Sequence, residues 1–233
     1  MHRSLAALAC VFALACTPDT NDDESASESA GESGSEGNET VGDSTDTGSE
    51  TATDSTDTGG GYGHGNLHPD CLGDNPQVVL ETSMGNLTLQ LDAVNAPMTV
   101  ANFLGYVSSG FYDGTIFHRV VDGFVVQGGG FEPGLVEKMT VGTIPLEISP
   151  LLRHDDGAIA MARRDMPDTA ESQWYICDGA QHGLDDAYAV FGVLIDGFEV
   201  RNAISAVAVH DEPPYGDVPD VDIIVEHAYC VMP

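Results

Sequence analysis

The sequence predicts a mainly β fold: a closed eight-stranded antiparallel β-barrel capped by two α-helices and preceded by a disordered N-terminal linker. Three observations lead to this prediction. Short runs in which apolar and polar residues alternate, a pattern typical of half-buried strands, recur from residue 76 onward. Two segments show the helical spacing of apolar residues. Glycines such as Gly123 and Gly157 separate the runs and fit the turns or bulges of a barrel.

The first two strands should form a hairpin. Residues 78–82 and 87–91 are rich in Val and Leu, and residues 83–86 join them by a tight turn. The leucines of the second run alternate with polar residues, so one face of that strand should be buried.

A helix is predicted next, over residues 97–109. Pro97 suits a first helical turn, apolar residues then recur three or four positions apart, and Gly110 ends the pattern. The remaining predicted elements are strands at 115–121, 124–128, 157–162, 173–177, 189–195 and 221–228 and a short helix at 198–205. In the last strand, Val221, Ile223 and Val225 should share one face.

The chain begins with a predicted export signal over residues 1–16. Arg3 precedes an apolar run that is too short to span a bilayer, and a small residue stands before Cys16. This arrangement resembles a bacterial lipoprotein signal, in which Cys16 would be lipidated; cleavage and simple secretion, or use of Cys10, are the alternatives. We therefore expect an exported protein, an outer-membrane lipoprotein whose domain lies in the periplasm or at the cell surface. A lipid anchor would be its membrane contact.

Residues 17–70 form an acidic segment rich in Ser, Thr and Gly. Such a composition cannot bury enough apolar surface to offset the entropy of ordering, so the segment should be a disordered linker. The folded domain is then expected to cover residues 71–233, a suitable length for one hydrophobic core.

The negative charge of the chain argues against two classes of partner. With a formal net charge of −31 and seven Lys and Arg residues, its surface should repel nucleic acid phosphates and anionic lipids. His64, His68 and Cys71 lie close in sequence, but no fourth ligand accompanies them, so no metal site is predicted.

Cysteine positions suggest one disulfide. An exported protein can form disulfides. Cys71 precedes the first predicted strand and Cys230 follows the last, so a bridge between them would join the two ends of the domain if those strands are neighbours. Cys177 lies in an apolar run and is expected to be a buried free thiol.

The most informative segment is 117–130, which places Arg119 among apolar residues and Gln127 before a run of three glycines. Arginine keeps its charge in proteins, so a partly buried one needs something to bind. The apolar and uncharged surroundings suit a neutral carbonyl or amide better than a phosphate.

Segment 117–130, together with five motifs of which one overlaps it, resembles the cyclophilins, the peptidyl-prolyl cis-trans isomerases. The resemblance covers about residues 77–227. Its motifs, in order, are Val-Ala-Asn-Phe at 100–103, Phe-Tyr-Asp-Gly-Thr-Ile-Phe-His-Arg at 111–119 leading into the first segment, Gly-Ala-Ile-Ala-Met-Ala-Arg at 157–163, Ser-Gln-Trp-Tyr-Ile at 172–176 and Tyr-Ala-Val-Phe-Gly at 188–192.

The resemblance implies roles for individual residues. Arg119 would be the catalytic arginine, and Gln127 would be a catalytic residue with it. The proline pocket would be lined by Phe124, Val125, Tyr175 and Leu184; the peptide backbone would be contacted by Gln127, Ala162 and Gln173; and Tyr188 stands where many members have His. Phe117 and Phe191 should belong to the core.

Some positions depart from the family pattern. Gly183 stands where an aromatic usually forms the pocket rim, and Val125 replaces a common Met. Tyr175 replaces the usual Phe, so its extra hydroxyl needs a hydrogen-bond partner.

The resemblance implies a monomeric isomerase of X-Pro bonds in exported or envelope proteins that needs no cofactor. Its partners would be proline-containing polypeptides. The alternative is a catalytically weak module that binds proline-containing segments. The active enzyme is favoured by Arg119, Phe124 and Gln127. The binding module stays open as an alternative because of Gly183.

Overall fold

The computed structural model describes residues 67–232. The predicted signal with Cys16 and the linker up to residue 66 lie outside these residues. The linker was expected to reach residue 70, but Leu67 already packs against the core, and Pro69–Cys71 form a 3-10 turn (η1).

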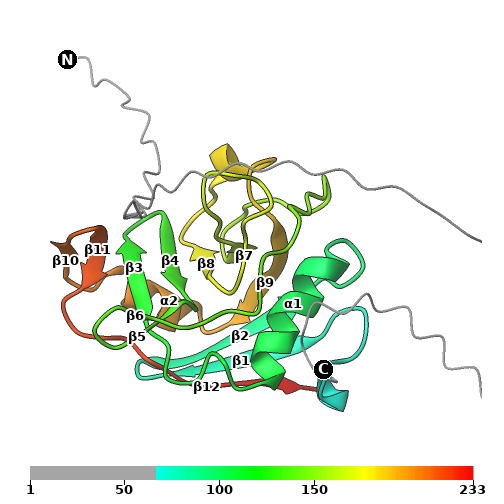
Figure 1. The fold of residues 1–233 in the computed structure, drawn as a ribbon, viewed down its shortest axis with the longest axis horizontal. Helices are drawn as coiled ribbons and strands as arrows, with labels where there is room; N and C mark the ends of the chain where they lie inside the picture. Colours follow the sequence, from blue (N-terminus) through cyan, green and yellow to red (C-terminus); the bar gives the residue numbers. More distant parts are fainter. Residues whose placement is uncertain (1–66, 233) are drawn as a thin grey trace, which may run out of the picture. The chain divides into compact units, whose positions relative to one another are not determined.

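An eight-stranded antiparallel sheet dominates the described part of the chain (Figure 1). Its strands, in sheet order, are β12 (Val225–Val231), β1 (Gln77–Thr82), β2 (Gly85–Leu91), β9 (Val190–Asp196), β7 (Ala158–Met161), β8 (Trp174–Cys177), β4 (Val125–Gly128) and β3 (Phe117–Val121). Two short hairpins accompany it, β5 (Phe131–Glu132) with β6 (Val136–Glu137) and β10 (Val209–Glu212) with β11 (Tyr215–Pro219).

The closed barrel predicted from the sequence is wrong, because the sheet is an open half-barrel. Its edge strands β3 and β12 share no ladder; an isolated bridge joins Ile116 to Ile224. The predicted strand at 221–228 begins too early, since β12 starts at Val225 and Val221 is 78% exposed. The chain before β12 meets β3 at its first residue, where Phe117 N–H donates to the Ile223 carbonyl at 2.9 Å, and β11 packs beside β3.

Both predicted helices are present. Helix α1 (Pro97–Ser108) places Val100, Phe103 and Leu104 in the main core. Helix α2 (Phe198–Ser205) adds Ile204 to the same core. Among residues 67–232, no helix is both long and apolar enough to cross a membrane.

The alternation of side chains along the strands separates two apolar clusters. In β8, Trp174 and Ile176 belong to the main core, which the helices also join. Tyr175 and Cys177 belong to a second cluster with alternate residues of β4 and β7. Because successive strand residues point to opposite faces, the second cluster lies on the other face of the sheet from the main core. The predicted core residues Phe117 and Phe191 are fully buried in the main core.

The ends of the domain are joined covalently. Cys71 and Cys230 form a disulfide with their Cα atoms 5.2 Å apart. Cys177 is free and buried, and burial raises the pKa of its thiol to about 12, so it carries little thiolate at neutral pH.

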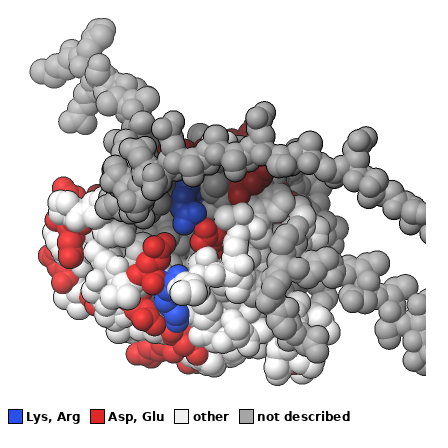
Figure 2. Space-filling model, viewed as in Figure 1, with Lys and Arg blue, Asp and Glu red and all other residues white. Residues whose placement is uncertain are grey.

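Among the charged side chains on the visible surface, acidic ones are more widespread than basic ones. On the face shown in Figure 2, Asp and Glu are spread widely, whereas Lys and Arg occupy two small areas.

Candidate active site

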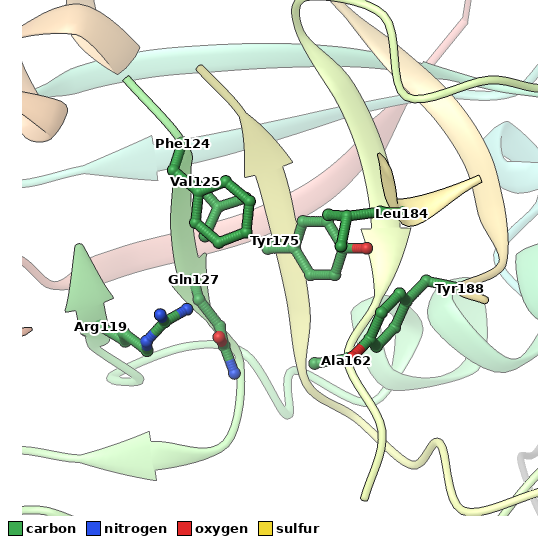
Figure 3. Close-up of a pocket in the computed structure, with 8 residues that line it drawn as sticks. All are labelled: Arg119, Phe124, Val125, Gln127, Ala162, Tyr175, Leu184 and Tyr188. Carbon is green, nitrogen blue, oxygen red and sulfur yellow. The ribbon is translucent and has the colours of Figure 1, made fainter. Parts of the chain in front are cut away.

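A shallow pocket lies over the second cluster (Figure 3). Its lining consists of Arg119, Phe124, Val125, Gln127, Ala162, Tyr175, Leu184 and Tyr188. The space between them is about 340 Å³, part of it open to solvent. Because this volume includes open solvent, the enclosed part is much smaller, and it suits one side chain and a short stretch of backbone better than a large cofactor. Of the residues predicted to form the peptide site, Gln173 alone is outside this lining.

Strand register brings the polar and apolar parts of the pocket into one row. Arg119 of β3 pairs with Gln127 of β4, Gln127 with Tyr175 of β8, and Tyr175 with Ala160 of β7. Directly opposed residues in antiparallel strands share a face and lie about 5 Å apart. The row therefore runs from a guanidinium through an amide to an aromatic ring and a small apolar residue.

A bulge in β3 aims Arg119 at the pocket. The register of β3 against β4 shifts between Phe117 and Arg119. Phe117 and Val120 both enter the main core, which strict alternation would forbid. The extra residue leaves Arg119 on the pocket face, and bulges commonly redirect a side chain in this way.

Small residues create the hollow. In β7, Ala158 and Ala160 face the second cluster, whereas Ile159 and Met161 face the main core. Large side chains at the alanine positions would fill the space above Tyr175. Sequence reasoning identified Ala162 by resemblance but did not identify Ala158 and Ala160, because their role follows from which face they occupy.

Gln173 lies beside the pocket and contacts one of its lining residues. Its Oε1 accepts a hydrogen bond from Gln127 Nε2 at 3.1 Å, so it orients the amide that lines the pocket. Gly130 makes room for it, because a Cβ atom at Gly130 would stand 2.5 Å from the Gln173 side chain.

Arg119 keeps most of its hydrogen-bonding capacity. Its side chain is 21% exposed, Nε lies 3.6 Å from Asp217 Oδ2, and the guanidinium carbon lies 5.9 Å from the centre of the Phe124 ring. Within residues 67–232, the guanidinium makes no hydrogen bond at normal distance. Next to it, burial and then the charge of Arg119 lower the pKa of His118 to about 3, so His118 is neutral at neutral pH.

Tyr175 has the partner that its hydroxyl requires. His154 Nε2 lies 3.0 Å from the Tyr175 hydroxyl, and His154 Nδ1 lies 2.9 Å from Asp185 Oδ1. The His154 side chain is fully buried, and burial lowers its pKa. The His154 backbone N–H donates to Asp185 and is the main cause of the lowered pKa of that carboxyl. No local pattern in the sequence indicated that Asp185 is linked to Tyr175 through His154.

The rim of the pocket follows the turn η2 (His182–Leu184), which supplies Leu184. At Gly183, a Cβ atom would meet nothing within 4 Å, so this part of the rim is open. Tyr188 lies over Arg163, whose guanidinium carbon is 4.9 Å from the ring centre and whose Nε donates to the Ala187 carbonyl.

Known proteins resemble this chain over the same domain. "Peptidyl-prolyl cis-trans isomerase A" of Dickeya dadantii is 46% identical over 159 residues, which cover 66% of this chain and 84% of that protein. "Peptidyl-prolyl cis-trans isomerase B" of Escherichia coli is 38% identical over 157 residues, 64% of this chain and 96% of that protein. A crystal structure of a Cryptosporidium parvum cyclophilin type isomerase has a TM-score of 0.59 at 29% identity and covers 68% of this chain and 99% of its own.

The family model described as cyclophilin type peptidyl-prolyl cis-trans isomerase/CLD matches residues 77–229, which include every residue that lines the pocket. On this match and on the curated relatives, the chain belongs to the cyclophilin-type peptidyl-prolyl cis-trans isomerases.

Proposed function

We propose that this domain accelerates cis-trans isomerisation of X-Pro bonds in exported or envelope proteins, with Arg119 stabilising the twisted amide. One observation carries the proposal: a guanidinium with unused donors stands in the same cross-strand row as an apolar hollow. The hollow would hold the proline ring while Arg119 faces the bond that rotates.

The chemistry needs no covalent intermediate. An X-Pro bond isomerises slowly because C–N resonance imposes a barrier of about 18–20 kcal/mol. A donor directed at the prolyl nitrogen localises its lone pair and weakens that resonance. A guanidinium that donates to the nitrogen and to the prolyl carbonyl would stabilise the twisted state more than either planar state, which is the condition for catalysis.

The other pocket residues have supporting roles in this proposal. Val125 and Tyr175 would form the floor under the ring, and Leu184 would close one side. Gln127, held by Gln173, would present its amide to the peptide backbone. A second crystal structure of the Cryptosporidium parvum relative was determined in the presence of the dipeptide Ala-Pro; it has a TM-score of 0.57 at 31% identity and covers 65% of this chain and 96% of its own.

A protease-coupled assay on a short X-Pro peptide tests the catalytic role. Arg119→Ala should lower kcat/KM by about a hundredfold or more, the effect expected for a charged donor to a transition state. Arg164→Ala is a matched control, because Arg164 is exposed, pairs with Glu171 and is outside the pocket. An Arg119→Ala protein with wild-type kcat/KM would exclude this mechanism.

The open rim at Gly183 supports a second candidate, a module that binds proline-containing segments and turns them over slowly. Calorimetric titration with the same peptide distinguishes the two. Saturable binding with no acceleration of isomerisation would favour the binding module.

We also propose that the domain acts outside the cytoplasm, anchored by a lipid at Cys16. The disulfide between Cys71 and Cys230 supports this, because such bonds persist in oxidising compartments. Incorporation of labelled fatty acid into the wild type and not into Cys16→Ser is the expected result. Equal labelling of both proteins would contradict it.

A further inference from the structure

Asp217 places a carboxylate beside the proposed catalytic arginine. It lies on β11, the strand that packs beside β3, and its Oδ2 is 3.6 Å from Arg119 Nε. Sequence reasoning assigned it no role, since almost a hundred positions separate the two residues in the chain.

The backbone around Asp217 presents this side chain through an irregularity. The β10–β11 ladder is regular at Val209 and His210 and then shifts register before Glu212 pairs with Tyr215. Asp217 lies in the shifted part of β11 and has a φ of 57°. Asp tolerates this left-handed conformation better than most residues, and such positions gather at functional sites.

Asp217 remains able to accept further hydrogen bonds. Its side chain is 44% exposed, and within residues 67–232 its recorded partner is Arg119, at a distance too long for a hydrogen bond. An exposed pair of this kind is weak, so the carboxylate can turn toward another cation without unfolding the site.

The proposed function places part of the substrate near this carboxylate, and the inference rests on it. If Arg119 donates to the prolyl carbonyl, the residue after proline is bonded through its backbone nitrogen to that carbonyl carbon. Its side chain then lies next to Arg119 and within reach of Asp217. We propose that Asp217 is a specificity-determining residue that favours Lys or Arg, and disfavours Asp or Glu, immediately after the proline.

The expected size of this preference follows from the exposure of the pair. Two unit charges about 5 Å apart in water interact weakly, so kcat/KM should differ by roughly three- to tenfold between Lys and Glu peptides. Salt screens exposed charges, so the preference should shrink toward about 0.5 M salt.

The test uses three peptides, Ala-Ala-Pro-Xaa-Ala with Xaa as Lys, Ala or Glu. NMR exchange spectroscopy measures isomerisation without a coupling protease, whose own preference would interfere. The same titrations give Kd for each peptide. The proteins are the wild type, Asp217→Asn, Asp217→Glu and Asp211→Asn. The last is a matched charge control, because Asp211 is exposed on β10 of the same hairpin.

The expected result is a Lys-over-Glu preference that Asp217→Asn removes and that Asp217→Glu and Asp211→Asn retain. An unchanged preference in Asp217→Asn would overturn the proposal. Equal slowing of all three peptides in Asp217→Asn would also overturn it, because Asp217 would then be positioning Arg119 and not reading the substrate. If the wild type accelerates none of the peptides, the proposed function fails, and the Kd series still decides the role of Asp217.

Discussion

Two arginines of this domain stand in opposite situations. Arg201 of α2 is 3% exposed, and its Nη1 donates to Asp156 Oδ1 at 2.8 Å and to the Cys177 carbonyl, while Asp178 lies 3.5 Å away. Its Nε donates to Asn202 Oδ1 at 2.8 Å. Arg119 is 21% exposed and faces one carboxylate at 3.6 Å.

The contrast shows what makes an arginine available for binding. Burying a guanidinium is costly unless its donors are satisfied, and Arg201 is satisfied by the oxygen atoms around it. That arginine holds the structure and has little left to offer a ligand. Arg119 is kept on the pocket face by a bulge, with its terminal donors unpaired among the described residues. Its binding capacity is therefore left for a substrate.

The largest expected effect tests the stabilising role of Arg201. Arg201→Ala should lower the free energy of unfolding by about 3 kcal/mol, because it removes the positive charge that faces Asp156 and Asp178 and one of the donors to the buried Cys177 carbonyl. Urea denaturation measures this. At low temperature, where the variant stays folded, kcat/KM should stay within about twofold of the wild type. A large loss of activity in the folded variant would remove the distinction between the two arginines.

The dependence of stability on pH tests the surroundings of Arg119, through its buried neighbour His118. The pKa of His118 is about 3 in the folded state, whereas an unfolded His titrates near 6.5. The unfolded chain therefore takes up the proton first as pH falls, so stability is lost from about pH 6.5 down to about 3. Because of His118, the free energy of unfolding should be about 2 kcal/mol lower at pH 5 than at pH 7.5.

Urea denaturation at pH 7.5 and pH 5 measures this loss of unfolding free energy. In His118→Phe the loss should be smaller than in the wild type by about 2 kcal/mol. His154, whose pKa is also lowered, acts in the same direction and should leave a remaining slope. An identical loss in the wild type and His118→Phe would show that His118 is not buried as a neutral group beside Arg119.

The hydroxyl of Tyr175 should contribute less. Tyr175→Phe leaves buried His154 Nε2 without that partner, so we expect a loss of about 1–2 kcal/mol in unfolding free energy. Activity should change less than about threefold, since the ring stays in the pocket. Tyr229→Phe serves as a control, because its partly exposed hydroxyl meets Glu81 and should cost less. Equal losses in both variants would contradict the special role of the His154 contact.

The smallest expected effect concerns the open rim. Gly183 has space for a side chain, so Gly183→Trp should fold normally and lower KM for X-Pro peptides by about two- to fivefold through added aromatic contact. Gly183→Ala, which adds no aromatic surface, should behave like the wild type. A higher KM in Gly183→Trp would show that the ring covers the pocket.

The sequence predicted most elements because their signals are local. The hairpin of β1 and β2, both helices and the strands that carry the site follow from period-two or helical patterns. The closed barrel was wrong because closure depends on a strand pairing over distant residues. The start of β12 at Val225 could not be read from an apolar segment that begins at Val221.

Local composition and the order of the motifs were thus enough to predict the family, the residues that line the pocket and the need of the Tyr175 hydroxyl for a partner. Strand alternation alone would misplace Arg119, because counting from Phe117 would turn it toward the core, whereas a bulge turns it toward the pocket. No sequence pattern predicted that Asp217 lies beside Arg119 or that His154 contacts Tyr175. Side-chain pairing across strands depends on register and on the paths of loops, which are set when distant segments pack together. The periodicity of the sequence indicates which residues are buried, whereas the packing of distant segments decides which side chains are in contact.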